Sequence, residues 1–386
     1  MASGEIVKVA ILYSSLFSHD GEKRMIGGIE TYLVELARLC SDIGIEPTIY
    51  QWSERPFNKR IDGTAVRGVP VLRRPYDQRP LALFRAASRN IDLESDLVIF
   101  GSDAQSVRSP CKRAVSIQHG VSWDLPARFL TAHRLLQRRP LGTLYKAWLR
   151  RRFMALFARC PNRVCVDYNF PNWYRTYLVG QPCGRDWVIP NFANIASTQQ
   201  LSLRWKDDRV TKVLFARRYC EFRGTRILAE AAHRALHCHP DLHFTLAGEG
   251  ADEQWLRSFF ATESRVGFVK YAHEESLDVH LRHHVAIVPS LASEGTSLSV
   301  AEAMGAGCAV IATAIGGITN MIIDGYNGLL VSPSAPALSA ALDQLVKDRA
   351  RMRGLGTNAY NVAAESFSLN KWRARWRDVI ETVSRL

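Results

Sequence analysis

The chain has 386 residues and contains no uninterrupted apolar stretch of about 18 residues, the length that a membrane-spanning helix needs. Its beginning, Met1 to Glu5, is short and acidic, and Lys8 interrupts the apolar run that follows. We therefore expect no secretory signal. The eight cysteines are scattered and make no close-spaced framework, which predicts reduced thiols in a cytosolic protein. No zinc-ligand spacing and no Asp-x-Asp sequence is present, so we expect no metal site.

Acidic residues are also in deficit, with 37 Asp and Glu against 50 Lys and Arg, which gives a net charge of +13. The hydrophobic fraction of 47% and the charged fraction of 23% exclude a disordered chain, a collagen-like repeat and a coiled coil. The positive charge suits nucleic acid, an anionic membrane surface or a phosphorylated substrate. No nucleic-acid module is recognisable, so we expect no nucleic-acid partner.

Strand and helix patterns alternate along most of the chain. A buried-strand pattern at Val7–Tyr13 precedes Gly27-Gly28, and residues 29–40 then show the apolar spacing of a helix face. Five or six further alternations follow between Val210 and Val346. This pattern predicts the α/β class, with two Rossmann-like, doubly wound domains in series.

The polar segment 193–208 breaks the alternation and is interpreted as a linker. The predicted parts are then a domain over 1–192, the linker, a domain over 209–368 and a helix over 369–386. One face of this last helix is apolar, and we expect it to pack against the first domain. That face consists of Trp372, Trp376, Val379, Ile380 and Val383.

The segment from Ser290 to Ile318 carries the most specific chemistry, because Glu294 precedes a predicted helix and Glu302 lies inside it. Good N-cap residue types stand directly before the helix, and a helix start suits an anion such as diphosphate. Glu294 could accept hydrogen bonds from sugar hydroxyls, and Glu302 could reach a ribose diol. An ordinary solvated glutamate is the alternative at each position, although the small and apolar neighbours of Glu302 argue against it.

Arg218 and Arg223 flank a short loop after the predicted strand Val210–Ala216. Two guanidinium groups at the carboxyl end of a strand can both point at one phosphate group. Surface charge in a basic protein explains them equally well.

These clusters, in this order, resemble the retaining nucleotide-sugar glycosyltransferases of the large GT4 family, which have the two-domain GT-B fold. The family's Glu-x7-Glu motif corresponds to Glu294 and Glu302, and its phosphate loop corresponds to residues 217–224. The other matching motifs are Gly27-Gly28, Ile189-Pro190-Asn191, Leu246-Ala247-Gly248-Glu249-Gly250, Gly316-Gly317 and Asp324-Gly325-x2-Gly328. The chain departs from the family pattern with Arg217 in place of a glycine, Arg223 in place of a lysine and Asn320 in place of a frequent glutamate.

The resemblance implies two domains that face a cleft, with a C-terminal helix that crosses back to the first domain. It also implies transfer of a sugar from a UDP- or GDP-sugar to a saccharide or lipid-linked saccharide, with no cofactor, in polysaccharide or glycolipid assembly. The arginines and the helix start would stabilise the leaving diphosphate without a metal. A nucleotide-sugar epimerase or a non-catalytic nucleotide-sugar binder of the same fold is the alternative.

The resemblance assigns roles residue by residue. Arg218 and Arg223 would bind the donor diphosphate, and Glu302 would hold the ribose. His119 follows the predicted strand Ala114–Gln118 and matches a first-domain active-site histidine, with an ordinary loop histidine as the alternative. The implied catalytic residues are His119 and Glu294, and the implied donor-binding residues are Gly27, Gly28, Arg218, Arg223, Thr296, Ser297, Leu298 and Glu302.

The stretch Arg128–Arg159 holds many Lys and Arg residues and no acidic one, and its second half shows an apolar helical stripe. It could attach the protein to an anionic membrane surface, where a lipid-linked acceptor would lie. It could equally be a helix that packs its stripe on its own sheet.

Overall fold

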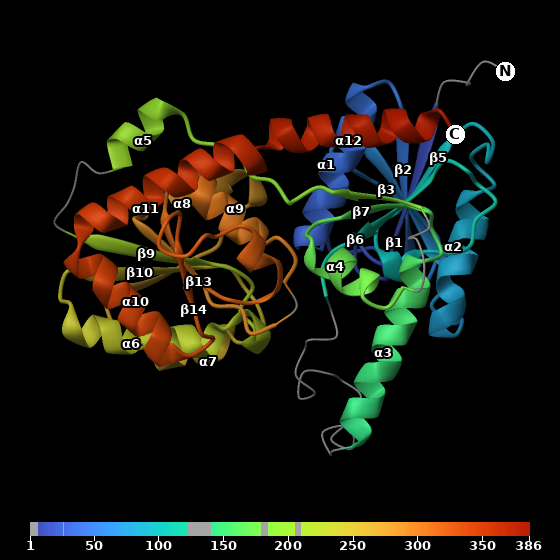
Figure 1. Cartoon of the computed structure of the whole chain (residues 1–386). Coiled ribbons are helices and arrows are strands. Elements are labelled where there is room, and N and C mark those ends of the chain that lie inside the picture. Colours follow the sequence, from blue (N-terminus) through green and yellow to red (C-terminus); the bar gives the residue numbers. More distant parts are fainter. Residues whose placement is uncertain (1–6, 26, 122–139, 179–183, 205–209, 293) are drawn as a thin grey trace. The chain divides into compact units, whose positions relative to one another are not determined.

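The computed structural model describes residues 7–25, 27–121, 140–178, 184–204, 210–292 and 294–386 (Figure 1). The chain forms two compact units. The first contains the chain up to His119 together with Pro140–Ile189 and Arg373–Leu386, and the second contains Pro190–Trp372.

The first unit is built on an eight-stranded sheet with the order β3-β4-β2-β1-β5-β6-β7-β8. All pairs in it are parallel except the hairpin β3–β4. The strands are β1 (Lys8–Tyr13), β2 (Glu46–Ser53), β3 (Phe57–Ile61), β4 (Thr64–Pro70), β5 (Leu97–Phe100), β6 (Ala114–Gln118), β7 (Asn162–Cys165) and β8 (Arg185–Val188). The helices are α1 (Gly28–Asp42), α2 (Arg79–Ala87), α3 (Leu141–Phe157) and α4 (Asn169–Arg175).

The second unit is built on a six-stranded parallel sheet with the order β11-β10-β9-β12-β13-β14. The strands are β9 (Thr211–Ala216), β10 (Leu242–Ala247), β11 (Val266–Val269), β12 (Val285–Val288), β13 (Ala309–Thr313) and β14 (Leu329–Val331). The helices are α5 (Thr198–Arg204), α6 (Thr225–Cys238), α7 (Glu253–Phe259), α8 (Ser276–Leu281), α9 (Leu298–Gly305), α10 (Ala335–Lys347) and α11 (Arg349–Val362), and α12 (Leu369–Ser384) continues into the first unit.

Helices cover both faces of the second sheet, because its central strands are apolar on both sides. Successive residues of β13 point to opposite faces, so that Ile311 joins a core with α6 and α10, and Val310 joins a core with α9 and α11. Every residue of β12 and β13 is buried. The parallel second sheet and the first sheet, which is parallel except for one hairpin, confirm the predicted α/β class with doubly wound domains.

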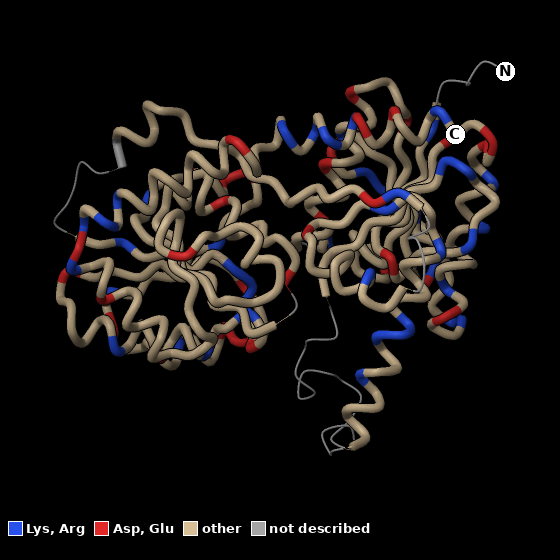
Figure 2. Tube along the Cα trace, viewed as in Figure 1, with Lys and Arg blue, Asp and Glu red and all other residues tan. Residues whose placement is uncertain are grey.

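Helix α3 projects from the rest of the first unit (Figure 1), and only its end, Leu156 and Phe157, is buried. The alternative that its stripe packs on the sheet is wrong for the helix's first half, because Leu141, Leu144 and Trp148 are exposed. The trace of α3 carries Lys and Arg positions and no Asp or Glu (Figure 2). Residues 128–139 of the predicted basic stretch lie outside the described residues.

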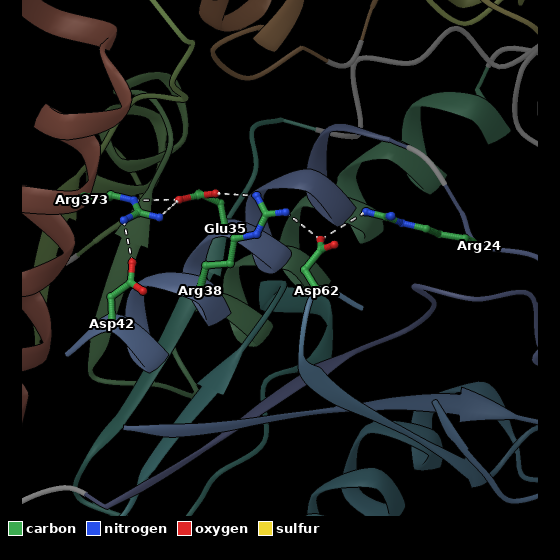
Figure 3. A network of polar contacts seen from close by, with 6 residues as sticks. All are labelled: Arg24, Glu35, Arg38, Asp42, Asp62 and Arg373. Atoms are coloured by element: carbon green, nitrogen blue, oxygen red, sulfur yellow. Dashed lines mark hydrogen bonds and ion pairs between the residues drawn. The ribbon is translucent and has the colours of Figure 1, made fainter. Parts of the chain in front are cut away.

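The first half of α12 packs against α1 through a buried aromatic pair and an ion-pair network. The indole N–H of Trp376 donates a hydrogen bond of 2.7 Å to the hydroxyl of Tyr32. Arg373 binds both Glu35 and Asp42, while Arg38 binds Glu35 and Asp62 (Figure 3). The side chain of Glu35 is only 7% exposed, so its two arginine partners satisfy a nearly buried carboxylate.

Some local elements differ from the expectations. The hairpin β3–β4 was not predicted, although its turn residues Asp62 and Gly63 both have positive φ, as an Asp-Gly hairpin turn requires. Helix α11 was not predicted either. The segment interpreted as a linker contains α5, and the division between the units falls after Ile189 rather than after residue 192.

We predict that Arg373→Met lowers the free energy of unfolding by about 1–2 kcal/mol, because Glu35 loses charge-assisted hydrogen bonds. Methionine has a helix propensity similar to that of arginine, and its side chain is also long and unbranched. Arg377→Met is the matched control on the same helix, since Arg377 is exposed. Urea unfolding with and without 1 M salt measures both variants, and the loss from Arg373→Met should shrink in salt. Equal losses for the two variants would contradict this account of the docking.

Candidate functional site

The candidate site of the second unit lies at the point where its strand order reverses. The chain winds outward from β9 through β10 and β11, then crosses back to β12 on the other side of β9. Loops that follow β9 and β12 therefore leave the sheet in opposite directions and open a crevice at the carboxyl edge, where α/β proteins bind ligands. Arg217 follows β9, and Ser290 and Glu294 follow β12.

Glu294 is held at this edge by three donors. The guanidinium groups of Arg217 and Arg223 and the hydroxyl of Ser290 all donate to its Oε1. Arg217 also donates to Ser290 Oγ. Among the described residues, Oε2 of Glu294 accepts no hydrogen bond.

The charges around Glu294 keep it ionised. Burial alone would raise the pKa of its carboxyl, but the charges of Arg217 and Arg223 and the hydrogen bonds from Ser290 and Arg217 outweigh burial and lower the pKa to about 2. The side chains of Glu294 and Arg217 are 7% and 6% exposed, whereas that of Arg223 is 27% exposed. The cluster has two positive charges and one negative charge, and Arg223 is its solvent-facing member.

Two glycines allow the loops to approach one another. Gly224 has φ +82°, and a Cβ there would lie 1.8 Å from the carbonyl oxygen of Pro289. Gly316 has φ +52°, and a Cβ there would lie 2.2 Å from the carbonyl oxygen of Glu294. The backbone N–H of Gly317 donates to that same carbonyl at 2.9 Å. Side chains at either glycine would push the loops apart and disperse the arginines around Glu294.

The start of α9 is fixed by Asn191, from the Ile-Pro-Asn motif. Its backbone N–H donates to Thr296 Oγ1 at 2.9 Å, and its side-chain amide donates to the Thr296 carbonyl. Ser297 is the N-cap residue, but its side chain makes no capping hydrogen bond. Thr296 and Ser297 are buried, and Leu298 begins the helix.

Glu302 lies on α9 in a different environment from Glu294. Burial raises the pKa of its carboxyl to about 7, against smaller lowering effects of Ser276 and Arg217. The Nδ1 atom of His273 lies 3.7 Å from Glu302 Oε1. A substantial fraction of Glu302 is therefore protonated at neutral pH and can donate a hydrogen bond.

The sequence analysis singled out Arg218, but Arg217 is the residue that joins Arg223 at Glu294, and Arg218 is exposed. It also missed Ser290 and His273. A serine four residues before a glutamate is too common a pattern to indicate such a contact. No three His, Cys, Asp or Glu side chains of the described ranges are grouped so that they could hold a metal ion.

The residues predicted in the first unit also lie at the carboxyl edge of its sheet. Gly27 is the N-cap of α1, and Gly28 is its first residue. His119 follows β6, and its Nε2 lies 2.9 Å from the carbonyl oxygen of Gly101, which follows β5. Burial lowers the pKa of His119 to about 4, so the imidazole is neutral near pH 7. Because a carbonyl can only accept, Nε2 carries the proton and Nδ1 keeps its lone pair.

We predict that Glu294→Gln lowers the free energy of unfolding at neutral pH by about 3–5 kcal/mol, because two guanidinium groups lose their counter-charge. A carboxyl whose pKa falls from 4.5 to about 2 on folding stabilises the protein fully above its ordinary pKa, and this stabilisation is lost as the pH falls toward 2. The stability gap between the wild type and the variant should therefore narrow with acidification. Denaturant unfolding over a series of pH values measures the gap.

Glu302→Gln is the matched comparison on the same helix. The raised pKa of Glu302 costs the wild type stability as the pH rises from about 4.5 to about 7. The stability of Glu302→Gln relative to the wild type should therefore increase as the pH rises over that interval. For Glu294→Gln the relative stability should instead decrease as the pH rises from about 2 to about 4.5. A gap of constant size for both variants would show that neither pKa differs between the folded and unfolded chain.

Comparison with known proteins finds similar sequences for the part of the chain that holds this site. Residues 210–348 match the family model described as "Glycosyl transferases group 1". A D-inositol 3-phosphate glycosyltransferase of Stackebrandtia nassauensis is 32% identical over 164 residues, which are 39% of this chain and 37% of that protein. The GtfA subunit of a UDP-N-acetylglucosamine–peptide N-acetylglucosaminyltransferase of Streptococcus pneumoniae is 27% identical over 162 residues, 39% of this chain and 31% of that protein. The chain thus spans about a third of the length of these curated relatives.

Solved structures match over the whole chain. A sucrose-phosphate synthase from Thermosynechococcus elongatus covers 98% of this chain and is itself covered to 99%, with 18% identity and a TM-score of 0.72. The Anabaena protein Alr3699/HepE, solved with UDP and glucose, covers 98% and is covered to 100%, with 18% identity and a TM-score of 0.71. At this identity the likeness establishes the fold. Residues 210–348 thus match the group 1 glycosyl transferase model, within a chain that has the two-domain GT-B fold.

Proposed function

We propose that this protein is a retaining glycosyltransferase that moves a sugar from a nucleoside diphosphate sugar to a saccharide or lipid-linked saccharide. The single observation that carries the proposal is the Glu294 cluster at the strand-order reversal. It combines a carboxylate, which can grip sugar hydroxyls, with guanidinium groups, which can hold a diphosphate. The family match of residues 210–348 supports the same chemistry.

The cluster's charges suit a donor with a diphosphate group. Arg223 is exposed enough to turn toward a bound phosphate, while Arg217 stays buried against Glu294. The backbone N–H groups at the start of α9 add donors on the same side of the sheet. As the bond to the sugar breaks, negative charge grows on the diphosphate, and these fixed positive groups stabilise it.

The two glutamates would contact different parts of the donor. Oε2 of the ionised Glu294 is an acceptor that matches a sugar hydroxyl. Glu302 can both donate and accept at neutral pH, which suits the paired hydroxyls of a ribose. In the first unit, His119 is neutral, and its unprotonated Nδ1 can accept a hydrogen bond from a hydroxyl group.

A thermal-shift panel of UDP, GDP and ADP tests donor binding. We expect one of them to raise the melting temperature, since a ligand at 100 times its Kd adds about 2.7 kcal/mol to stability. Arg223→Met should abolish the shift. Lys212→Met, exposed near the opposite end of β9, is the matched control and should keep it. A shift that persists in Arg223→Met would contradict the role of this loop.

Acceptor dependence separates transfer from the alternative activities. With the nucleotide sugar that binds, a transferase releases nucleoside diphosphate in proportion to added acceptor. An epimerase converts the donor without an acceptor, and a binding protein does neither. Either of those results would refute transfer while leaving the donor site intact.

We further propose that α3 attaches the protein to an anionic membrane surface, where a lipid-linked acceptor would lie. Leu144 is 65% exposed and Trp148 is 51% exposed. Arg150 and Arg151, on the same helix, are also exposed, and α3 has no acidic residue. Exposed apolar side chains beside basic ones are typical of helices that lie in the headgroup region. In the described part of the chain, no helix meets the length and apolarity that crossing a bilayer requires.

Sedimentation with vesicles that contain anionic lipid tests this surface. We expect the wild type to bind, and the double variant Arg150→Glu, Arg151→Glu to bind at least tenfold more weakly, since each basic residue contributes about 1 kcal/mol. Arg152 is left intact because it pairs with Asp77. The control Arg73→Glu, Arg74→Glu makes the same charge change at exposed positions outside α3. Equal binding by both double variants would exclude α3 as the contact.

A further inference from the structure

A short series of contacts links the C-terminal helix to His119, and all of its members belong to the first unit. Trp376, on α12, donates its indole N–H to the hydroxyl of Tyr32, on α1, at 2.7 Å. The ring of Tyr32 meets the ring of His119 edge to face, with centroids 5.3 Å apart and an angle of 87° between the planes. The rings of Trp376 and Tyr32 are also in edge contact at 6.2 Å. Both aromatic residues are fully buried.

The contacts restrain the imidazole on two sides. The Gly101 carbonyl accepts a hydrogen bond from Nε2. The ring of Tyr32 packs against the imidazole and limits its rotation about the Cβ–Cγ bond. The position of the Tyr32 ring depends in turn on its hydroxyl, which is anchored by Trp376. A small displacement of Trp376 would thus reach His119 through one intervening side chain.

The ion-pair network fixes the register of α12 on α1. Tyr32 and Glu35 are three residues apart on α1, and Arg373 and Trp376 are three residues apart on α12, so each pair occupies one helix face. Tyr32 contacts Trp376 and Glu35 contacts Arg373, so two neighbouring contacts join α1 to α12. Figure 3 shows the contact between Glu35 and Arg373. A shift of Trp376 relative to Tyr32 would therefore also disturb the ion pair between Arg373 and Glu35.

We propose that Trp376 is a positioning residue for His119, acting through Tyr32. The C-terminal helix then sets the orientation and the tautomer of the histidine, so that Nδ1 stays unprotonated and faces a constant direction. The effect on sugar transfer rests on the proposed function, but the effect on the imidazole does not.

Nuclear magnetic resonance of the full chain with ¹⁵N-labelled histidine tests the positioning directly. The signals of His119 are assigned by their loss in His119→Gln. We expect the wild type to show a single tautomer protonated at Nε2. Trp376→Phe and Tyr32→Phe, which remove the hydrogen bond and keep a ring, should each shift these signals and populate the second tautomer.

Trp372→Phe is the matched control, because Trp372 is equally buried on the same helix but contacts Phe192 in the second unit. Its His119 signals should match those of the wild type. Signals that stay unchanged in both Trp376→Phe and Tyr32→Phe would overturn the proposal. Two variants are used so that a folding defect in one leaves the other to decide.

Kinetics supply the second readout. In Trp376→Phe and Tyr32→Phe we expect kcat to fall about ten- to hundredfold with little change in the donor KM, as misplacement of a catalytic group predicts. Trp372→Phe should keep kcat within about twofold. If the wild type transfers no sugar, the proposed function fails while the tautomer measurement still tests the positioning. If kcat falls while the tautomer is unchanged, the positioning role fails and the proposed function stands.

Discussion

The candidate site depends on one interaction, the burial of the Glu294 carboxylate between two guanidinium groups. A buried carboxylate alone would take up a proton, and two adjacent guanidinium groups, one of them buried, would repel each other without a counter-charge. Together they satisfy one another, provided that the loops after β9 and β12 come close. The adjacency of those strands brings the loops together, and Gly224 and Gly316 remove the side chains that would hold them apart. The same arrangement leaves an excess positive charge at the edge where an anionic donor would bind.

Both units place their polar groups by the same topological device. In each unit the chain winds outward from a central strand and then crosses to the other side of that strand. This happens between β1 and β5 in the first unit and between β9 and β12 in the second. Parallel strands end at one edge, so residues far apart in sequence, such as His119 and Gly101, meet there. The scaffold needs only apolar strands, which leaves the loop residues free to carry chemistry.

The sequence was a good guide to this scaffold and a poorer guide to the side chains. Buried strands such as β12 are continuous apolar runs, and they were readily recognised between helical patterns. A strand that is buried on both faces has no alternation of apolar and polar residues. The sequence of β9 therefore does not indicate whether Arg217 or Arg218, which follow it, points toward the site. That is why Arg218 was singled out although Arg217 contacts Glu294. The hairpin β3–β4 was missed for a different reason, because its Asp62-Gly63 turn follows a strand in which the consecutive Lys59 and Arg60 put a charged residue on each face.

The two glutamates of the Glu-x7-Glu motif show most clearly what spacing leaves open. The motif gives two identical side chains, yet burial is opposed by two arginine charges at Glu294 and acts almost alone at Glu302. One carboxyl is consequently ionised throughout the physiological range, and the other changes its protonation near neutrality. An ionised carboxylate can only accept hydrogen bonds, whereas a protonated one can also donate. The chemical difference between the two positions therefore arises from residues outside the motif, so the motif by itself cannot assign their roles.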